Sequence, residues 1–315
     1  MTFDPNDYPL LPAELAAVMV GVPTMPPVTA ESVRAIREHA RVASARQTRS
    51  EVHRVEGRTL PGPDGGVPVR VYTPSPATPL PVLVFGHGGG WCMCDIDTHD
   101  ALCREIANRA EVLVVSVDYR LAPENPYPAG LEDFYAAASW VAEHAADIGG
   151  DPTRVAVGGD SAGANLATVT CLAARDRGGP TFRHQLLAYP GLDAVSQRAS
   201  WTEMAHAPMV SAETARSMWA AYTAGHDPRD PYLSPVHASD LSGLPPAIIV
   251  APGYDHGRDD FEAYAVALAK AGVEVDFRPY PGMLHGFLSY FAAVPACSRA
   301  LDEVCAALRK ALTTD

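Results

Sequence analysis

The chain has 315 residues, with 24 Lys or Arg against 37 Asp or Glu, which gives a net charge of −13 at pH 7. This length is enough for one large α/β domain with a smaller appendage. The acidic balance excludes nucleic acid and anionic membrane surfaces as partners, because both bind to a basic protein face.

The N-terminus does not have the pattern of a targeting or membrane segment. Residues 1–7 are acidic rather than basic, and the apolar stretch 10–20 is interrupted by Pro12 and Glu14. A signal peptide needs a basic start and an unbroken apolar region, and a membrane span needs a longer one. We therefore expect no membrane span and a cytoplasmic location.

The first predicted elements are a helix and a β-hairpin. Residues 29–44 are typical of a helix: Thr29 can act as the N-cap, and apolar residues recur at helical spacing at Val33, Ile36 and Ala40. Residues 52–71 contain two segments of alternating polarity around the sequence PGPDGG, which predicts a hairpin turn.

From there, strand and helix patterns alternate. The predicted strands are residues 81–85, 112–117, 154–157, 185–189, 247–250 and 273–280. The predicted helices are residues 98–108, 130–145, 162–174, 259–271 and 297–312. Apolar runs without polar alternation, such as residues 112–115, are typical of parallel strands covered on both faces. The pattern predicts an α/β fold whose central sheet is mostly parallel, is flanked by helices and has an antiparallel edge at the hairpin.

The alternation stops between residues 191 and 239. This stretch is rich in large apolar side chains and contains a predicted helix at 211–224; the side chains are Trp201, Met204, Met209, Met218, Trp219 and Tyr222. It is too long for a connection and too apolar for a disordered linker. We expect residues 1–50 (N-terminal cap helices) and 191–235 (cap insertion) to form a discontinuous lid over a core of residues 51–190 and 236–315. The methionines fit either a surface for varied apolar ligands or a small core.

Residues 159–163, with the sequence GDSAG, match the G-x-S-x-G nucleophile elbow. Ser161 falls between a predicted strand and a predicted helix, so its hydroxyl would project from a strained turn that small neighbours permit. The start of the helix would direct N–H groups toward it. A phosphate-binding loop is the alternative, but no Gly-Lys-Ser/Thr follows.

A second glycine motif, HGGG at residues 87–90, is typical of the loop that supplies an oxyanion hole. We expect the backbone N–H groups of Gly88, Gly89 and Ala162 to bind the oxyanion that forms during acyl transfer. We also expect that a side chain at Gly89 would block the substrate carbonyl.

A serine nucleophile needs a histidine base, and the elbow implies the chain order Ser, Asp, His. His285 lies after the last predicted strand, between glycines that allow a loop, and is our predicted base. The other histidines considered after Ser161 are predicted to be surface or packing residues: His184, His206, His226 and His237.

Asp255 is our predicted triad carboxylate, because it follows the strand 247–250 at the end where ligand chemistry collects in open α/β sheets. Asp259 and Asp260 are rivals, although their position at the start of a helix explains them structurally. His256 is expected to point away from the site.

The six cysteines are expected to be free thiols. Cys92, Cys94 and Cys103 lie near His99, but this spacing fits no common structural zinc pattern. We predict no metal site.

With these motifs assigned, the chain resembles the hormone-sensitive-lipase-like family of α/β-hydrolases, the bacterial family IV carboxylesterases, in its GDSAG branch. Further matching segments are YRLAPE at 119–124, DPYLSP at 230–235 and LSGLPP at 241–246. The resemblance implies an α/β-hydrolase fold with a helical cap and a triad of Ser161, Asp255 and His285. It also implies hydrolysis of short- to medium-chain carboxylic esters of small molecules, no cofactor, and the dimerisation that is common in such relatives.

Two departures from the family pattern concern the pocket. Where relatives usually have DPLRD, this chain has DHGRD from Asp255 to Asp259, and Cys94 replaces a glycine that usually follows the oxyanion loop. Alternative functions are a deacetylase or amidase with the same acyl-enzyme chemistry. A non-catalytic ligand receptor on the same fold is a further alternative, which the presence of His285 disfavours.

Overall fold

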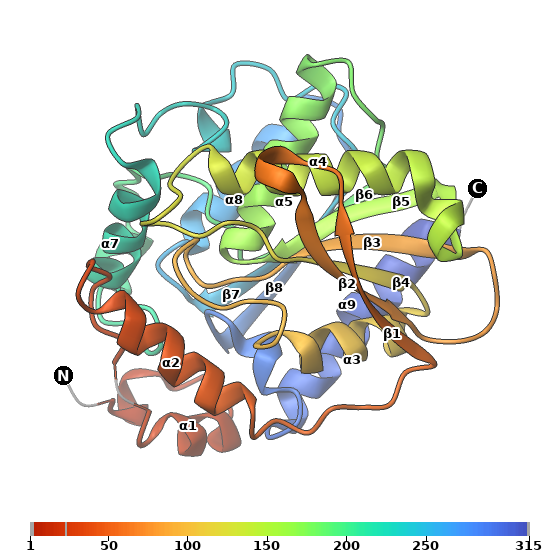
Figure 1. The fold of residues 1–315 in the computed structure, drawn as a ribbon. Coiled ribbons are helices and arrows are strands. Elements are labelled where there is room, and N and C mark those ends of the chain that lie inside the picture. Colours follow the sequence, from red (N-terminus) through yellow and green to blue (C-terminus); the bar gives the residue numbers. More distant parts are fainter. Residues whose placement is uncertain (1–2, 23, 314–315) are drawn as a thin grey trace.

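The computed structural model describes residues 3–22 and 24–313. One sheet runs through the molecule in the order β1-β2-β4-β3-β5-β6-β7-β8 (Figure 1). Its strands are β1 (Arg54–Leu60), β2 (Val67–Thr73), β3 (Leu80–Gly86), β4 (Leu113–Val117), β5 (Gly150–Asp160), β6 (His184–Ala188), β7 (Ala247–Tyr254) and β8 (Val275–Leu284). The helices are α1 (Ala13–Met19), α2 (Val33–Ser44), α3 (Asp100–Ala110), α4 (Ala129–His144), α5 (Ala162–Asp176), α6 (Ser200–Glu203), α7 (Ala212–Thr223), α8 (Arg258–Lys270) and α9 (Pro295–Thr313).

The sheet confirms the predicted fold class. β1 and β2 form the antiparallel hairpin and β2 pairs antiparallel with β4, whereas β3 to β8 pair in parallel with their neighbours. Every residue of β3 and β4 is buried, as the apolar runs predict. Parallel strands need cover on both faces, and the helices provide it.

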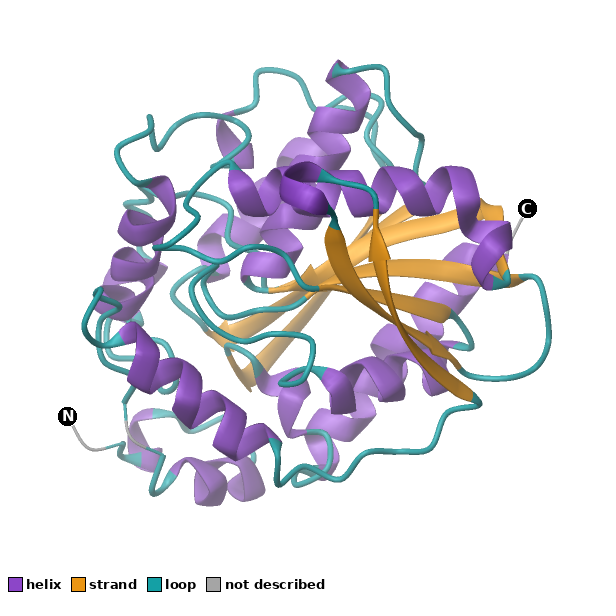
Figure 2. Ribbon diagram, in the orientation of Figure 1, coloured by secondary structure: helices purple, strands orange, loops and turns teal. Residues whose placement is uncertain are grey.

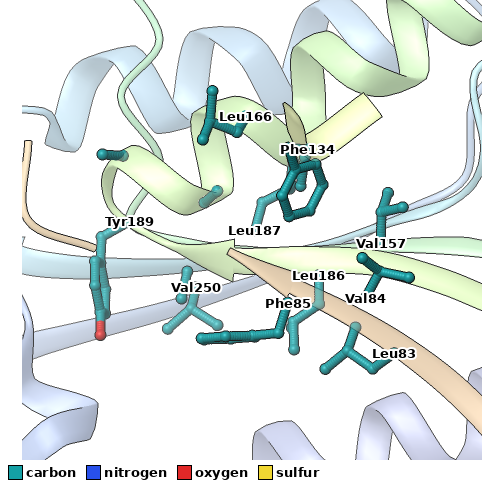
Figure 3. Packing of buried hydrophobic residues seen from close by; sticks show 14 of the residues in the cluster. Leu83, Val84, Phe85, Phe134, Val157, Leu166, Leu186, Leu187, Tyr189 and Val250 are labelled. Atoms are coloured by element: carbon teal, nitrogen blue, oxygen red, sulfur yellow. The ribbon is translucent and has the colours of Figure 1, made fainter. Parts of the chain in front are cut away.

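Helices α4, α5 and α8 lie on one face of the sheet, and α3 and α9 lie on the other (Figures 1 and 2). Side chains alternate between the faces along each strand. Figure 3 shows Val84 and Val157, which are paired in the sheet, on the same side as Phe134 of α4 and Leu166 of α5, while Phe85 points to the opposite side. The core is therefore two apolar layers that hold the carboxyl ends of the strands in fixed positions.

Some element boundaries differ from the prediction. Helix α2 begins at Val33, because residues 29–32 form a turn in which the Thr29 hydroxyl accepts a hydrogen bond from the Ser32 N–H at 3.0 Å. The short helices α1 and α6 were not predicted, since seven and four residues are too few for a helical repeat to stand out.

The N-terminal segment lies against the predicted cap insertion. The Thr214 hydroxyl of α7 donates to the Met25 carbonyl at 2.8 Å, and the Val28 N–H donates to the Ser217 hydroxyl at 2.7 Å. These contacts join the two predicted parts of the cap, while the exact division into cap and core stays a prediction. Among the described residues, no helix combines the length and the apolar character that crossing a membrane requires.

Candidate active site

Ser161 occupies the sharp turn between β5 and α5. Its φ of 54° and ψ of −115° are strained for a residue with a side chain, and its N–H donates to the Ala188 carbonyl at 2.8 Å. A side chain at Gly159 or at Gly163 would collide with the Gly86 carbonyl at the end of β3. The two glycines of the motif are thus required by the close approach of a neighbouring strand, and the strained φ lies at the serine itself.

The structure brings together the three predicted triad residues. Nε2 of His285 lies 2.9 Å from the Ser161 hydroxyl oxygen, and Nδ1 lies 2.6 Å from an Asp255 carboxylate oxygen. The other oxygen of Asp255 accepts a hydrogen bond from the Gly257 N–H at 2.8 Å. With the Nδ1 proton donated to Asp255, Nε2 is the acceptor that faces the serine hydroxyl.

Electrostatics favour charge separation between Asp255 and His285. Burial alone would raise the pKa of Asp255, but the His285 imidazolium and the hydrogen bonds hold that pKa below its ordinary value. Burial would lower the pKa of His285, and the Asp255 carboxylate outweighs burial and raises it. The pair can therefore stabilise an imidazolium.

The two alternative carboxylates, Asp259 and Asp260, bond to groups other than His285. Asp259 pairs with Arg258 at 3.0 Å and accepts a hydrogen bond from the Ser200 N–H, while Asp260 accepts one from the Trp201 indole at 2.8 Å. Both side chains thereby fasten the segment around α6 to the start of α8.

The other histidines that were considered as the base have contacts or positions that account for them structurally. The His237 ring lies 3.1 Å from Asp193, the His226 ring stacks edge-on against Tyr127, and His184 is the first residue of β6. The carbonyl of His206 accepts a hydrogen bond from the Tyr8 hydroxyl.

The expectation that His256 points away is wrong. Its buried ring stacks on His285 with centroids 5.6 Å apart, and Nδ1 lies 3.6 Å from an Asp255 oxygen. Burial lowers the pKa of His256 to about 4, so the ring is neutral at pH 7. The flanking backbone turns because the Asp255 carboxylate binds the Gly257 N–H, a contact that the sequence does not reveal.

The oxyanion loop differs from the prediction at one donor. The Gly88 N–H donates to the Asp160 carboxylate at 2.8 Å, so this group is already used. Within the described part of the chain, no acceptor takes the N–H of Gly89, Gly90 or Ala162, and all three residues line the cavity at Ser161. A Cβ atom at Gly89 would collide with the Met93 carbonyl rather than project toward a substrate.

A buried polar cluster behind the loop was missed by the sequence reasoning. Asp160 lies 3.2 Å from Nε2 of His99, and burial, which would raise the pKa of Asp160, is outweighed by the His99 charge and by hydrogen bonds, so that this pKa is lowered. A His87 ring nitrogen lies 2.7 Å from the Gly88 carbonyl. The position of Asp160 beside the nucleophile was the available signal, whereas nothing in the sequence links His99 to it.

The cavity at Ser161 measures about 180 Å³. Its wall is mostly apolar and includes four methionines from four separate segments, Met25, Met93, Met209 and Met218. Cys94 also lines it, and burial raises the pKa of that thiol to about 12, so the thiol stays protonated. Among residues 3–22 and 24–313, no group of His, Cys, Asp or Glu is arranged to hold a metal ion.

Comparison with known proteins gives a consistent result. A sequence model for a family described as having the alpha/beta hydrolase fold matches residues 83–289. The chain is 47% identical to carboxylesterase NlhH of Mycobacterium tuberculosis over 82% of this chain and 83% of that protein. It is 43% identical to carboxylic ester hydrolase LipN of the same species, over 90% of this chain and 77% of LipN.

Solved structures agree with these sequence matches. An esterase from Pyrobaculum calidifontis superposes with a TM-score of 0.88 at 36% identity and covers 95% of this chain and 98% of its own. The identity and coverage are high enough to establish common family membership together with the fold. The chain belongs to the hormone-sensitive-lipase-like family of α/β-hydrolases, the bacterial family IV carboxylesterases.

Proposed function

We propose that this protein is a serine carboxylesterase in which Ser161, His285 and Asp255 act as the triad. The main support for this proposal is the chain of hydrogen bonds from the Ser161 hydroxyl through His285 to the buried Asp255 carboxylate. Nε2 of His285 takes the hydroxyl proton as the Ser161 oxygen attacks the ester carbonyl carbon. Asp255 keeps the ring in the required tautomer and stabilises the imidazolium.

The tetrahedral intermediate then collapses to an acyl-enzyme. The bond to the alcohol oxygen breaks, and His285 returns the proton to the leaving alcohol. In the second half, His285 deprotonates a water molecule that attacks the acyl carbon, and the acid departs as Ser161 regains its proton. Asp255 serves the same positioning role in both halves.

The donors for the oxyanion are, in this proposal, the N–H groups of Gly89, Gly90 and Ala162. Each is without an acceptor among the described residues and lines the cavity, and Ala162 is the first residue of α5, where the helix dipole is positive. Such preorganised donors are each worth about 2.7–4 kcal/mol in the transition state. Gly88 is replaced by Gly90 in this set because Asp160 holds the Gly88 N–H.

The cavity supports short- to medium-chain esters of small molecules as substrates. Its volume of about 180 Å³ is close to the roughly 150 Å³ of an apolar cavity that accommodates benzene. Methionine side chains are flexible and polarisable, so a wall that contains four of them adapts to acyl or alcohol groups of different shape. Of the two interpretations of the methionines, this favours ligand contact for Met209 and Met218.

The variant Ser161→Ala tests the proposal. Hydrolysis of p-nitrophenyl butyrate should fall by about 10⁶-fold, because the nucleophile is lost while the fold is kept. Thermal unfolding of the variant should match the wild type. Undiminished turnover would refute the assignment, and a fluorophosphonate probe that labels wild-type Ser161 would exclude a purely passive receptor.

Acyl-chain length separates the substrate classes. Along a series of p-nitrophenyl esters from acetate to palmitate, kcat/KM should be highest at the short and medium members and low for palmitate. A maximum at palmitate would contradict the cavity argument. Parallel assays with aryl acetamides and acetylated small molecules would reveal an amidase or deacetylase.

We further propose a cytoplasmic location and a homodimer. The six cysteines support the first, because all are free thiols, as is usual in a reducing compartment. β8 is the last strand of the sheet order, and one side of it is available for pairing with a second copy. Analytical ultracentrifugation at micromolar concentration tests the dimer, and a monomer would contradict it.

A further inference from the structure

One arginine of helix α2 reaches the loop that carries the proposed oxyanion donors. Nε of Arg37 donates to the Cys92 carbonyl at 2.7 Å, and one terminal nitrogen donates to the Ala122 carbonyl at 2.9 Å. The guanidinium also forms a two-pronged ion pair with Glu124, at 2.9 and 2.7 Å. Arg37 follows Ile36 and lies one turn after Val33, the buried residues of α2, so it is on the inner side of the helix.

The two carbonyls belong to adjacent backbone segments. Ala122 donates its own N–H to the Trp91 carbonyl at 2.8 Å, so the turn at residues 91–92 lies against the turn at residue 122, and Arg37 bonds to both. Cys92 and Ala122 are both fully buried. Buried carbonyls need donors, and the guanidinium supplies them in a fixed fork that a lysine lacks.

Cys92 is directly connected to the proposed oxyanion donors. The N–H groups of Cys92 and Met93 both donate to the Gly89 carbonyl, at 3.1 and 3.0 Å, which folds residues 89–93 into one tight turn. Gly90 lies inside that turn. A displacement of Cys92 therefore moves the peptide groups that carry the proposed oxyanion donors.

The turn has further attachments besides Arg37. The Gly88 N–H is fixed to Asp160, and the Trp91 ring stacks on Tyr222 of α7 with centroids 4.5 Å apart and nearly parallel planes. Arg37 attaches the turn to the N-terminal segment. Figure 1 places α2 and α7 next to each other beside the carboxyl ends of the strands.

We propose that Arg37 is a positioning residue for the oxyanion hole, through which the N-terminal helix α2 sets the geometry of the Gly89 and Gly90 N–H groups. This inference rests on the proposed function. Arg37 does not touch substrate; it acts through the carbonyls of Cys92 and Ala122. Its effect is expected in the transition state, where the oxyanion forms, rather than in substrate binding.

The test compares Arg37→Met with Arg34→Met, a change at an exposed arginine of the same helix whose side chain forms no ion pair or hydrogen bond with the described residues. Methionine keeps the apolar stem of Arg37 and removes every donor. We measure kcat and KM for p-nitrophenyl butyrate, and the inhibition constant of an aliphatic trifluoromethyl ketone, whose hemiketal oxygen would occupy the oxyanion hole. A third variant, Glu124→Gln, keeps Arg37 and its bonds to the two carbonyls.

For Arg37→Met we expect kcat to fall about tenfold, which is less than the roughly 10²–10³-fold fall in kcat when a whole oxyanion donor is removed. KM should change less than about twofold, and the trifluoromethyl ketone should bind about tenfold more weakly, because both the transition state and the hemiketal use the same N–H groups. The acidic limb of the pH profile should stay in place, since Asp255 and His285 are unchanged. The kcat of Arg34→Met should equal that of the wild type, and the kcat of Glu124→Gln should lie between those of the wild type and Arg37→Met.

Active-site titration with a fluorophosphonate, carried to completion, separates positioning from folding. An unchanged kcat per titrated site in Arg37→Met would overturn the proposal, as would a loss that appears only in KM. Failure of the proposed function would appear differently, as an active Ser161→Ala variant or a wild-type protein that the fluorophosphonate does not label.

Discussion

The two halves of the proposed active site are built in different ways. The triad half is joined by its own side chains: His285 bonds directly to Ser161 and to Asp255, and each residue follows a strand of the central sheet. The N–H groups of the proposed oxyanion half have no acceptor among the described residues. The loop that carries those of Gly89 and Gly90 is held by contacts with Asp160, α7 and α2.

Because of this difference, substitutions in the two halves should reduce activity to different extents. The triad depends on the chemistry of three side chains, so a substitution there removes a function outright. The oxyanion loop depends on geometry that several distant segments enforce, so single changes should weaken it by degrees. The following predictions separate the two cases.

The largest effect after loss of the nucleophile is expected for Asp255→Asn. An asparagine does not hold His285 in the required tautomer, and kcat should fall by about 10⁴. Asp255 raises the pKa of His285, so its removal should lower that pKa and move the acidic limb of kcat/KM to lower pH. Steady-state assays from pH 5 to 9 measure both.

Asp259→Asn is the control for this prediction. Asp259 is the rival carboxylate, and it binds Arg258 and the Ser200 N–H rather than His285. Its replacement should leave the acidic limb in place and cost far less activity. An equal loss in both variants would mean that the acid has been assigned wrongly.

On the oxyanion side, Gly89→Ala should have the next largest effect. Gly89 has a φ of +113° and its Cβ position overlaps the Met93 carbonyl, so a side chain forces the turn to shift. We expect kcat to fall by about 10²–10³ with little change in KM, as for the loss of a donor. Gly57→Ala, where a Cβ meets nothing within 4 Å, is the matched control and should be fully active. A Gly89→Ala variant with normal kcat would refute the role of this turn.

Much of the triad half was predictable from the sequence, and the reason is local. Ser161 lies in a contiguous motif, and Asp255 and His285 follow apolar strand patterns, so chain order and strand ends suffice to find them. His256 was misjudged because its direction depends on the turn at Gly257, which a carboxylate hydrogen bond sets.

The oxyanion half was less predictable for the opposite reason. The HGGG motif identifies the loop, but which glycine N–H is free depends on Asp160, far away in sequence. Arg37 lies still farther from the motif, and nothing in its own segment distinguishes it from Arg34 or Arg41. Contacts between distant segments decide which N–H groups of this loop are free, and these contacts cannot be read from a single sequence.

A smaller effect is expected for Asp160→Asn. Asparagine can still accept the Gly88 N–H, so the loop keeps its place while the buried charge near His99 is lost. We expect kcat/KM to fall roughly tenfold, less than for a lost donor. The Asp160 charge also raises the pKa of His285, so the acidic limb should move to lower pH by less than in Asp255→Asn.

The free energy of unfolding gives an independent check on the role of Asp160. In the folded state the pKa of Asp160 lies below the ordinary value of 3.8. The Asp160 charge therefore stabilises the fold fully above pH 3.8, and this contribution is lost as the pH falls through the folded-state pKa. Asp160→Asn should lower the free energy of unfolding at pH 7 by about 1 kcal/mol, because hydrogen bonds to a charged group contribute about 1.5–3 kcal/mol and those to a neutral group about 0.5–1.5 kcal/mol. An unchanged unfolding curve at pH 7 would contradict a stabilising role for the Asp160 charge.

The smallest effect is expected for His256→Phe, although this ring stacks directly on His285. The rings of His256 and His285 stack on each other beside the Asp255 carboxylate. Burial and the charge of His285 lower the pKa of His256 to about 4, whereas the Asp255 carboxylate outweighs burial and raises the pKa of His285. A phenyl ring keeps the stacking and removes no charge above about pH 4. We therefore expect kcat/KM to change within about threefold, or about 0.6 kcal/mol, with the acidic limb unmoved. If the limb moves by about a full pH unit, corresponding to about 1.4 kcal/mol, the two imidazoles share one proton, and the triad half then depends on its surroundings as much as the oxyanion half does.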